Sequence, residues 1–291
     1  MRFIATPASS IGVSIHTAAR FHGAIAMNFG VEAGGKDAYG LPTTWRSVHD
    51  GVDRFVWRCN VADFLCGADV ANPPELPATF DIVSSVPDIA EVRPNVSPEQ
   101  YEQWCANVVK HMMDLLPPDR VCILYQTPGR YTGADGSWLD KGFFCQLGAR
   151  QAGAKCVWQK VVLYQDSVGR KRGGTRGGFI NLLCFSKRHR VPREHKAVDV
   201  LADRGHMSYG HAMGEAACRV AIEYCMELPR PSGGREAAAV PIVDFFCGHG
   251  SVLGVANAFG LPAYGMDISL RCCETAAAHR ARLADAIPKH E

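Results

Sequence analysis

The sequence predicts an α/β fold, and three observations carry the prediction. Short apolar runs of strand length alternate along the chain with longer segments of helical periodicity. Near the C-terminus, residues 242–269 show the pattern of a strand, a glycine-rich turn, a helix, a second strand and an acid. With 291 residues and 47% hydrophobic composition, the chain can bury a full core as one large domain or two small ones.

The glycine-rich turn lies between two predicted strands, 242–246 and 263–266. Its glycines let the backbone approach a ligand, and the N-terminus of the following helix offers free N–H groups to a negative group. Asp267 follows the second strand, where a carboxylate can accept hydrogen bonds from a ribose diol. A dinucleotide and S-adenosylmethionine (SAM) both suit this plan, although Gly254 comes one residue later than the third glycine of a dinucleotide fingerprint.

Residues 244–251, D-F-F-C-G-H-G-S, resemble the D-P-F-x-G-x-G-[ST] loop of SAM-dependent amino-methyltransferases that act on nucleic-acid bases. Residues 264–268, Y-G-M-D-I, resemble the strand end that follows this loop in that family. The resemblance implies SAM as cofactor and a Rossmann-like, seven-stranded class I methyltransferase sheet. The residues that we predict to bind SAM are Asp244, Phe245, Phe246, Gly248, Gly250, Ser251, Asp267, Ile268, Asn60 and Ser208.

Two of these residues lie far from the turn in the sequence. Asn60 follows a predicted strand over residues 55–59, at the place where the resembled family has an acid that faces the adenine of SAM. Asn60 suits a turn equally well. Ser208 follows His206 in a segment similar to the H-P-[ST] segment of the family, which brackets the methionine half of SAM, and it could also cap the next helix.

Residues 80–89, F-D-I-V-S-S-V-P-D-I, resemble the family's fourth-strand signature, [FV]-D-[LIV]-[IV]-x-[ST]-[DNS]-P-P-[YFW]. In the family, the polar side chain and a proline carbonyl accept hydrogen bonds from the exocyclic amine, and the aromatic stacks on the extruded base. Of the last four positions only Pro87 is kept, because Val86 cannot accept a hydrogen bond through its side chain and Ile89 cannot stack. Asp88 could bind an amine or act as general base, or it could cap a turn. Pro87 and Asp88 are therefore the predicted acceptor-side residues, and the acceptor stays open.

The remaining segments continue the alternation of helices and strands. Serine, proline and glutamine open a helix in the usual order, with Ser97 as its cap. This helix ends at Pro117. The other predicted elements are a strand over 121–125, a loop over 127–136, a helix over 138–151, paired strands over 155–164 and 179–185, a helix over 212–227 and a final helix capped by Ser269.

The order of these motifs also favours the resembled family. Dinucleotide folds usually begin with their glycine fingerprint, whereas this chain ends with its glycine-rich turn. The order resembles circularly permuted amino-methyltransferases, in which acceptor motifs come first and the SAM loop last. In that arrangement the hairpin over residues 155–185 would be the antiparallel hairpin at one edge of the sheet. Residues 54–291 would form a single methyltransferase-like domain, and residues 1–53 an N-terminal extension or cap.

Positive charge is concentrated in one part of the chain. Residues 150–196 contain twelve Lys and Arg but two acids, although the net charge of the whole chain is +2. Arg170, Lys171, Arg172 and Arg176 lie in a glycine-spaced loop suited to phosphate contact. We therefore predict RNA or DNA as a partner, with a solvated basic loop as the alternative.

Composition limits the other classes. The twelve cysteines include no C-x-x-C pair, which argues against a zinc site or a disulfide framework and for a reducing compartment, with cytoplasm as the default. The first acid is Glu32, so that the N-terminus is faintly similar to an organelle transit peptide. No apolar run approaches the roughly 20 residues of a membrane span.

These observations predict a SAM-dependent methyltransferase whose acceptor is unknown, with nucleic acid as the first candidate. Two alternatives stay open: a catalytically silent nucleic-acid-binding protein on a methyltransferase scaffold, and a nicotinamide-dependent oxidoreductase. The sequence does not indicate the oligomeric state.

Overall fold

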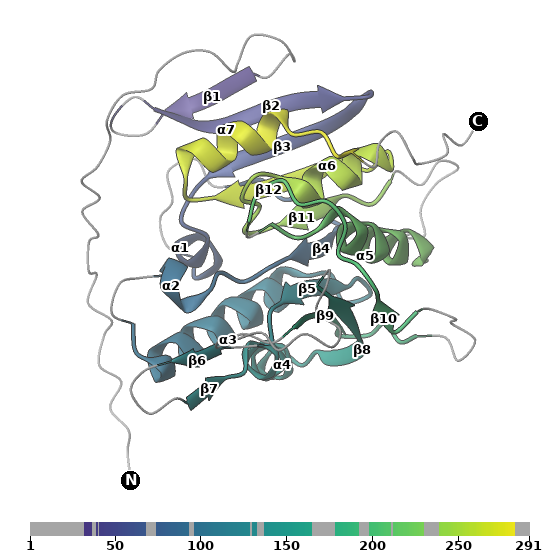
Figure 1. Ribbon diagram of the computed structural model, residues 1–291. Coiled ribbons are helices and arrows are strands. Elements are labelled where there is room, and N and C mark those ends of the chain that lie inside the picture. The colour runs from purple at the N-terminus through teal and green to yellow at the C-terminus, as the bar shows by residue number, and fades with distance from the viewer. Residues whose placement is uncertain are drawn as a thin grey trace.

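A ten-stranded mixed sheet forms the centre of the protein in the computed structural model (Figure 1). The structure describes residues 32–36, 39, 41–67, 74–92, 96–128, 130–132, 137–164, 178–191, 198–210, 212–229 and 239–282. The strand order is β1-β2-β3-β12-β11-β4-β5-β9-β8-β10, which is three strands more than the sequence predicted. The α/β class is confirmed.

The strands of this sheet are β1 (Glu32–Lys36), β2 (Pro42–His49), β3 (Val52–Arg58), β4 (Asp81–Ser84), β5 (Cys122–Gln126), β8 (Lys155–Leu163), β9 (Phe179–Ser186), β10 (Val200–Leu201), β11 (Ile242–Asp244) and β12 (Ala263–Asp267). A separate two-stranded sheet contains β6 (Arg130–Thr132) and β7 (Ser137–Leu139). The helices are α1 (Val61–Leu65), α2 (Ile89–Val92), α3 (Pro98–Leu115), α4 (Lys141–Gln151), α5 (Glu215–Glu227), α6 (Ser251–Ala258) and α7 (Leu270–Ala278).

Five central strands run in the same direction. β3, β12, β11, β4 and β5 pair in parallel, so that their carboxyl ends meet at one edge of the sheet. β11 and β12 come from the C-terminal part of the chain, yet they lie between β3 and β4 from the N-terminal half (Figure 1). Loops at the carboxyl edge of such sheets are where α/β folds bind ligands.

Helices cover both faces of the sheet. One apolar core joins strand residues to α5, α6 and α7, and it includes Ile222, Leu253 and Ala276. The second core joins the opposite face to α1, α3 and α4, and it includes Leu65 and Met112. No described helix is both long enough and apolar enough to span a lipid bilayer.

Most predicted elements are present, with shifted boundaries. The hairpin of residues 155–164 and 179–185 is confirmed, because β8 and β9 pair antiparallel, and β10 adds one more strand outside β8. The Ser97 cap of α3 is a full capping box with Gln100, and Ser269 caps α7. Helix α4 begins at Lys141 rather than at residue 138, because Asp140 is its N-cap and the preceding residues pair in β7.

Two differences concern the ends of the predicted domain. Helix α5 begins at Glu215, with Gly214 at its N-cap, so that Ser208 does not cap it as the sequence suggested. Residues 42–49, which the sequence left without a firm prediction, form β2 and pair antiparallel with β3 in the main sheet. The alternate residues that β2 buries are Thr43, Trp45, Ser47 and His49, so most of them are polar and the hydrophobic pattern of the strand is weak.

Candidate functional site

The glycine-rich turn connects the carboxyl end of β11 to α6. Gly248 and Gly250 both adopt left-handed backbone conformations, with φ of 50° and 83°. Gly250 is the N-cap of α6 and makes no side-chain cap hydrogen bond. A Cβ atom at Gly250 would lie 2.8 Å from the Cα atom of Ala276 on α7, so this position requires glycine. The N-terminus of α6 is therefore uncapped by a side chain, as an anion-binding helix end would be.

Asp267 lies at the end of β12, the strand next to β11. Its Oδ2 atom accepts a hydrogen bond from the backbone N–H of Gly248 at 3.1 Å, and its Oδ1 atom accepts one from Ser269 at 2.7 Å. Burial raises the pKa of Asp267, whereas these two hydrogen bonds oppose the rise. Each carboxylate oxygen keeps a further lone pair, so Asp267 can still accept a hydrogen bond from a ligand hydroxyl.

Asp244 connects the ends of β11 and β4. Its Oδ1 atom accepts hydrogen bonds from Ser84 Oγ at 2.7 Å and from the backbone N–H of Phe246 at 3.1 Å. The side chain is buried, and burial raises its pKa to about 7 against the opposing effect of these hydrogen bonds. Asp244 is therefore a buried carboxyl group that changes charge near neutral pH.

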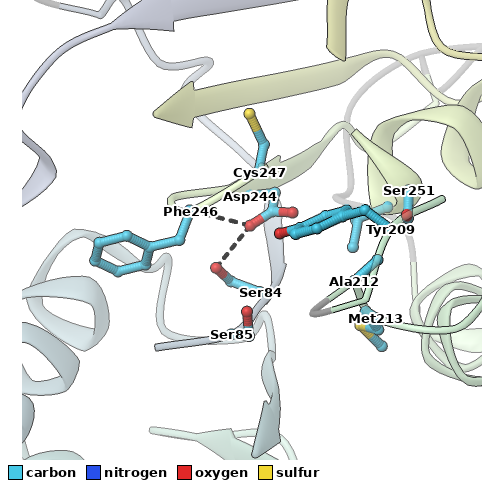
Figure 2. A pocket seen from close by; sticks show the side chains of 10 residues that line it. Ser84, Ser85, Tyr209, Ala212, Met213, Asp244, Phe246, Cys247 and Ser251 are labelled. Carbon is cyan, nitrogen blue, oxygen red and sulfur yellow. Dashed lines mark hydrogen bonds between the residues drawn. The ribbon is translucent and has the colours of Figure 1, made fainter. Parts of the chain in front are cut away.

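A small cavity opens beside Asp244 (Figure 2). Figure 2 shows Asp244 between the side chains of Ser84 and Tyr209, with Ser251 on the far side of the Tyr209 ring. Ser208 reaches the same place, because its Oγ atom lies 2.8 Å from Oγ of Ser251 at the start of α6. The cavity lining is Ser84, Ser85, Tyr209, Ala212, Met213, Asp244, Phe246, Cys247, Ser251 and Val252.

Tyr209 packs against the glycine-rich turn. Its ring centroid lies 4.2 Å from that of His249, and its hydroxyl oxygen would be 2.5 Å from a Cβ atom at Gly248. Sequence reasoning missed Tyr209, although it directly follows the segment that resembles H-P-[ST]. It also missed Ser84 and Ser85, although Ser85 occupies the [ST] position of the fourth-strand signature.

Not all of the predicted cofactor residues reach the cavity. The side chain of Phe245 is fully buried in the core and stacks on Phe64 of α1, whereas Phe246 lines the cavity. Ile268 follows Asp267 and is exposed. Asn60 is the N-cap of α1, because its Oδ1 atom accepts a hydrogen bond from the backbone N–H of Ala62. These positions do not test the predicted contacts with a cofactor.

The predicted acceptor residues have partners within the protein. The Pro87 carbonyl oxygen accepts a hydrogen bond from the Tyr101 hydroxyl at 2.7 Å. Asp88 Oδ1 accepts one from the backbone N–H of Ile89 at 2.8 Å, at the start of α2. The Asp88 side chain is therefore hydrogen-bonded within its own turn, and Val86 is buried in the core.

The basic residues Arg170, Lys171, Arg172 and Arg176 lie outside the described residues. The strands on either side of them are described: β8 is parallel to β5, because β9 pairs antiparallel with both. Thus β8 ends, and β9 begins, at the same edge of the sheet as the glycine-rich turn. In the described part of the chain, no group of three or more His, Cys, Asp or Glu is placed to hold a metal ion.

Solved structures share this fold at low sequence identity. A putative DNA modification methylase from Thermus thermophilus, solved in complex with SAM, has a TM-score of 0.53 at 14% identity, over 81% of this chain and 95% of that one. The PvuII DNA methyltransferase, described as cytosine-N4-specific, has a TM-score of 0.54 at 13% identity, over 79% and 87%. No protein-family model matches the sequence, and no curated protein matches it. The chain therefore has a methyltransferase-like fold.

Proposed function

We propose that this protein is a SAM-dependent methyltransferase. The observation that carries the proposal is the hydrogen bond between the Gly248 backbone and Asp267, which joins an uncapped helix N-terminus to a carboxylate at the next strand end. The two groups suit the two halves of an adenosyl amino acid, since backbone N–H groups bind its carboxylate and Asp267 binds its ribose. The DNA methylase from Thermus thermophilus, which has the same fold, was solved with SAM.

The proposed cofactor site extends over the carboxyl ends of three strands. Gly248, Gly250 and Ser251 would lie along the methionine end, with Ser208 beside them. Asp244, at the end of β11, would pair with the α-ammonium group of the methionine. The remaining predicted residues would lie toward the ribose and adenine or support the turn: Asp267, Ile268, Asn60, Phe245 and Phe246.

The finer fold assignment supports the same proposal. We assign β3-β12-β11-β4-β5-β9-β8 as the seven-stranded methyltransferase sheet, with β1, β2 and β10 as additions. In this assignment the motif order is permuted, because β11 and β12 come last in the chain and lie in the middle of the sheet. The methyltransferase-like domain over residues 54–291 would then include this sheet, apart from the first two residues of β3.

SAM supplies a methyl group that its sulfonium already activates. The protein therefore has mainly to hold an acceptor in line with that group and to exclude water. We assign this role to the segment after β4, which contains Pro87 and Asp88. Nucleic acid is the proposed acceptor, because the basic segment between β8 and β9 starts and ends at the carboxyl edge, and because proteins of this fold include DNA methyltransferases.

Calorimetry with SAM, S-adenosylhomocysteine and NAD tests the proposal. We expect binding of both adenosyl compounds and none of NAD, and we expect Asp267→Ala to weaken the binding of both. Binding of NAD alone would instead support the nicotinamide-dependent oxidoreductase. If neither adenosyl compound bound, the methyltransferase proposal would be wrong.

One observation favours a second candidate, a catalytically silent nucleic-acid-binding protein. The Pro87 carbonyl is already hydrogen-bonded to Tyr101, and the neighbouring Val86 is buried. This candidate predicts salt-dependent binding of single-stranded oligonucleotides without methyl transfer. Neutralising Arg170, Lys171, Arg172 and Arg176 would abolish that salt-dependent binding.

A further inference from the structure

One polar side chain at the carboxyl edge of the sheet, near the proposed acceptor segment, is buried without a partner. Gln126 is the last residue of β5, and its side chain is 1% exposed. Its Nε2 atom is buried and has no hydrogen-bond partner among the described residues. A buried amide without a partner costs about 1–3 kcal/mol, so such a group needs a reason to be kept, and a ligand that satisfies it is one such reason.

The side chain of Gln126 faces the same side of the sheet as α3 and α4. Cys122 and Leu124 alternate with it along β5, and both belong to the core beneath these helices. Asn181 is its partner on β9, and directly opposite residues of an antiparallel pair point to the same face. Asn181 Oδ1 accepts a hydrogen bond from Gln159 at 3.1 Å and none from Gln126.

A lysine starts the neighbouring helix. Lys141 is the first residue of α4 and is 5% exposed, and its ammonium group forms no salt bridge within the described residues. The next residue, Gly142, packs against Asn181, since a Cβ atom there would lie 3.6 Å from Asn181 Nδ2. The first turn of α4 therefore lies over the pair formed by Gln126 and Asn181.

Gln126 also lies level with the residue at which the acceptor signature departs from its family pattern. Ser84 on β4 pairs with Leu124 on β5, so that Val86, two residues further on, comes level with Gln126. Both side chains are on the face covered by α3 and α4, because Val86 belongs to the same core as Leu124. The polar group that is missing at Val86 is thus present on the adjacent strand.

We propose that Gln126 determines the specificity of the acceptor site, and that its carboxamide replaces the polar side chain that β4 lacks. Its oxygen would accept a hydrogen bond from an exocyclic amine, and its Nε2 would donate one to the neighbouring ring nitrogen. Adenine and cytosine both carry such an edge. Lys141 would add a second donor beside it, which matches the O2 carbonyl of cytosine and has no counterpart on adenine. The inference rests on the proposed methyltransferase function and selects cytosine as the base.

Methyl transfer to simple oligonucleotides tests the inference. The substrates are single-stranded oligothymidylates with one central cytosine or one central adenine, incubated with tritiated SAM, and the product base is identified by mass spectrometry. We expect the wild-type protein to label the cytosine oligonucleotide. Gln126→Leu should reduce kcat/KM for transfer about 10- to 100-fold, because a good bidentate contact to a base is lost. Lys141→Met should reduce it by a smaller factor while SAM affinity stays within about twofold of wild type.

Two controls separate recognition from folding. Gln146→Leu makes the same chemical change at a half-buried position on α4, and we expect wild-type transfer from it. The melting temperature of Gln126→Leu should equal or exceed that of the wild type, because the substitution removes an unsatisfied buried donor. A purely structural glutamine would instead lower the melting temperature.

The outcomes are distinguishable. Equal transfer by Gln126→Leu and the wild type would overturn the inference and leave the methyltransferase proposal intact. Labelling of the adenine oligonucleotide alone, or SAM binding without labelling of either one, would overturn it as well. A wild-type protein that does not bind SAM would instead overturn the proposed function on which the inference rests.

Discussion

The two halves of the candidate site are built in different ways. Most of the proposed cofactor half comes from one short stretch, residues 244–268, and only Asn60 and Ser208 lie elsewhere in the sequence. The proposed acceptor half gathers residues from the segment after β4, from the end of β5 and from the start of α4, which are far apart in the sequence. The cofactor half depends on backbone geometry, whereas the acceptor half depends on which side chains the fold brings together.

This difference explains why the two halves are not equally readable. A left-handed glycine at a helix N-terminus is a local requirement, so the residue type itself reports the conformation. A hydrogen-bonding group near an acceptor can come from any strand whose end reaches the edge. The loss of a polar residue at Val86 therefore does not show that the acceptor site lacks a polar group. Substitutions in each half should separate the effects of backbone geometry from the effects of side chains that the fold brings together.

The largest expected effect is on the glycine-rich turn itself. Gly250→Ala would place Cβ 2.8 Å from the Cα atom of Ala276 at a φ of 83°, so we expect a loss of unfolding free energy of about 3 kcal/mol. At Gly248, where φ is 50°, the three atoms nearest to the added Cβ would be the hydroxyl oxygen and two ring carbons of Tyr209, a side chain that can move. Gly248→Ala should therefore weaken SAM binding more than it destabilises the fold. Urea unfolding and calorimetry on both variants measure this, and equal destabilisation would contradict it.

The second prediction concerns the carboxylate at the end of β12. Asp267→Asn turns one acceptor oxygen into an amide that faces the N–H of Gly248 or Ser269. We expect SAM affinity to fall about 10- to 100-fold, with a much smaller effect on the melting temperature. Asp53→Asn is the matched control, because Asp53 is on the neighbouring strand β3 and pairs with Arg46 at the surface. If both variants bound SAM like the wild type, Asp267 would not be a ribose ligand.

The sequence was sufficient for most strands of the central sheet. Hydrophobic runs located β4, β5, β11 and β12, because buried parallel strands are continuously apolar. It was not sufficient for the start of α4. Trp138 and Leu139 are as hydrophobic as helix residues, but they pair with β6, and Asp140 begins the helix. That competition is decided by contacts with another segment, which a local pattern does not contain.

Polar residues near strand ends were harder to interpret for a related reason. Asn60 and Asp88 are both residue types that cap helices and that bind ligands, so their chemistry alone cannot separate the two roles. In the structure each one accepts a hydrogen bond from a nearby backbone N–H, at Ala62 and Ile89 respectively. Gln126 shows the converse, since nothing in its sequence context marked it, whereas its missing partner in the fold does.

The third prediction uses the buried carboxyl group of the cofactor half. The pKa of Asp244 is raised from 3.8 to about 7, so the folded state retains its proton to a higher pH than the unfolded state does. Stability should therefore fall as pH rises from about 4 to 7. Asp244→Asn keeps an oxygen for Ser84 and Phe246 but removes the charge, so we expect it to stabilise the fold by about 1–3 kcal/mol at pH 8 and very little at pH 4.

The same variant should bind SAM less tightly, because an amide cannot pair with the α-ammonium group. In the wild type, SAM affinity should decrease below about pH 7 as Asp244 becomes protonated. Urea unfolding at pH 4 and pH 8, together with calorimetry over the same range, measures both effects. A variant that is less stable than the wild type at pH 8 would show that the charge of Asp244 stabilises the fold.

The smallest expected effect is on a helix cap outside both halves of the site. It tests whether the loss of a cap lowers stability without changing SAM affinity. In α3, Ser97 and Gln100 form a reciprocal capping box, whereas α6 starts at a glycine without any side-chain cap. Ser97→Ala removes the hydroxyl that accepts the Gln100 N–H, so we expect a loss of about 1 kcal/mol in unfolding free energy and SAM affinity within about twofold of wild type. Ser269→Ala is the informative partner, because it removes the hydroxyl that caps α7 next to Asp267 and keeps the backbone N–H that donates to the Asp267 carboxylate. We expect Ser269→Ala to weaken SAM binding and Ser97→Ala to leave it unchanged. That result would show that the start of α7 contributes to SAM binding, whereas the cap of α3 contributes only to the stability of the fold.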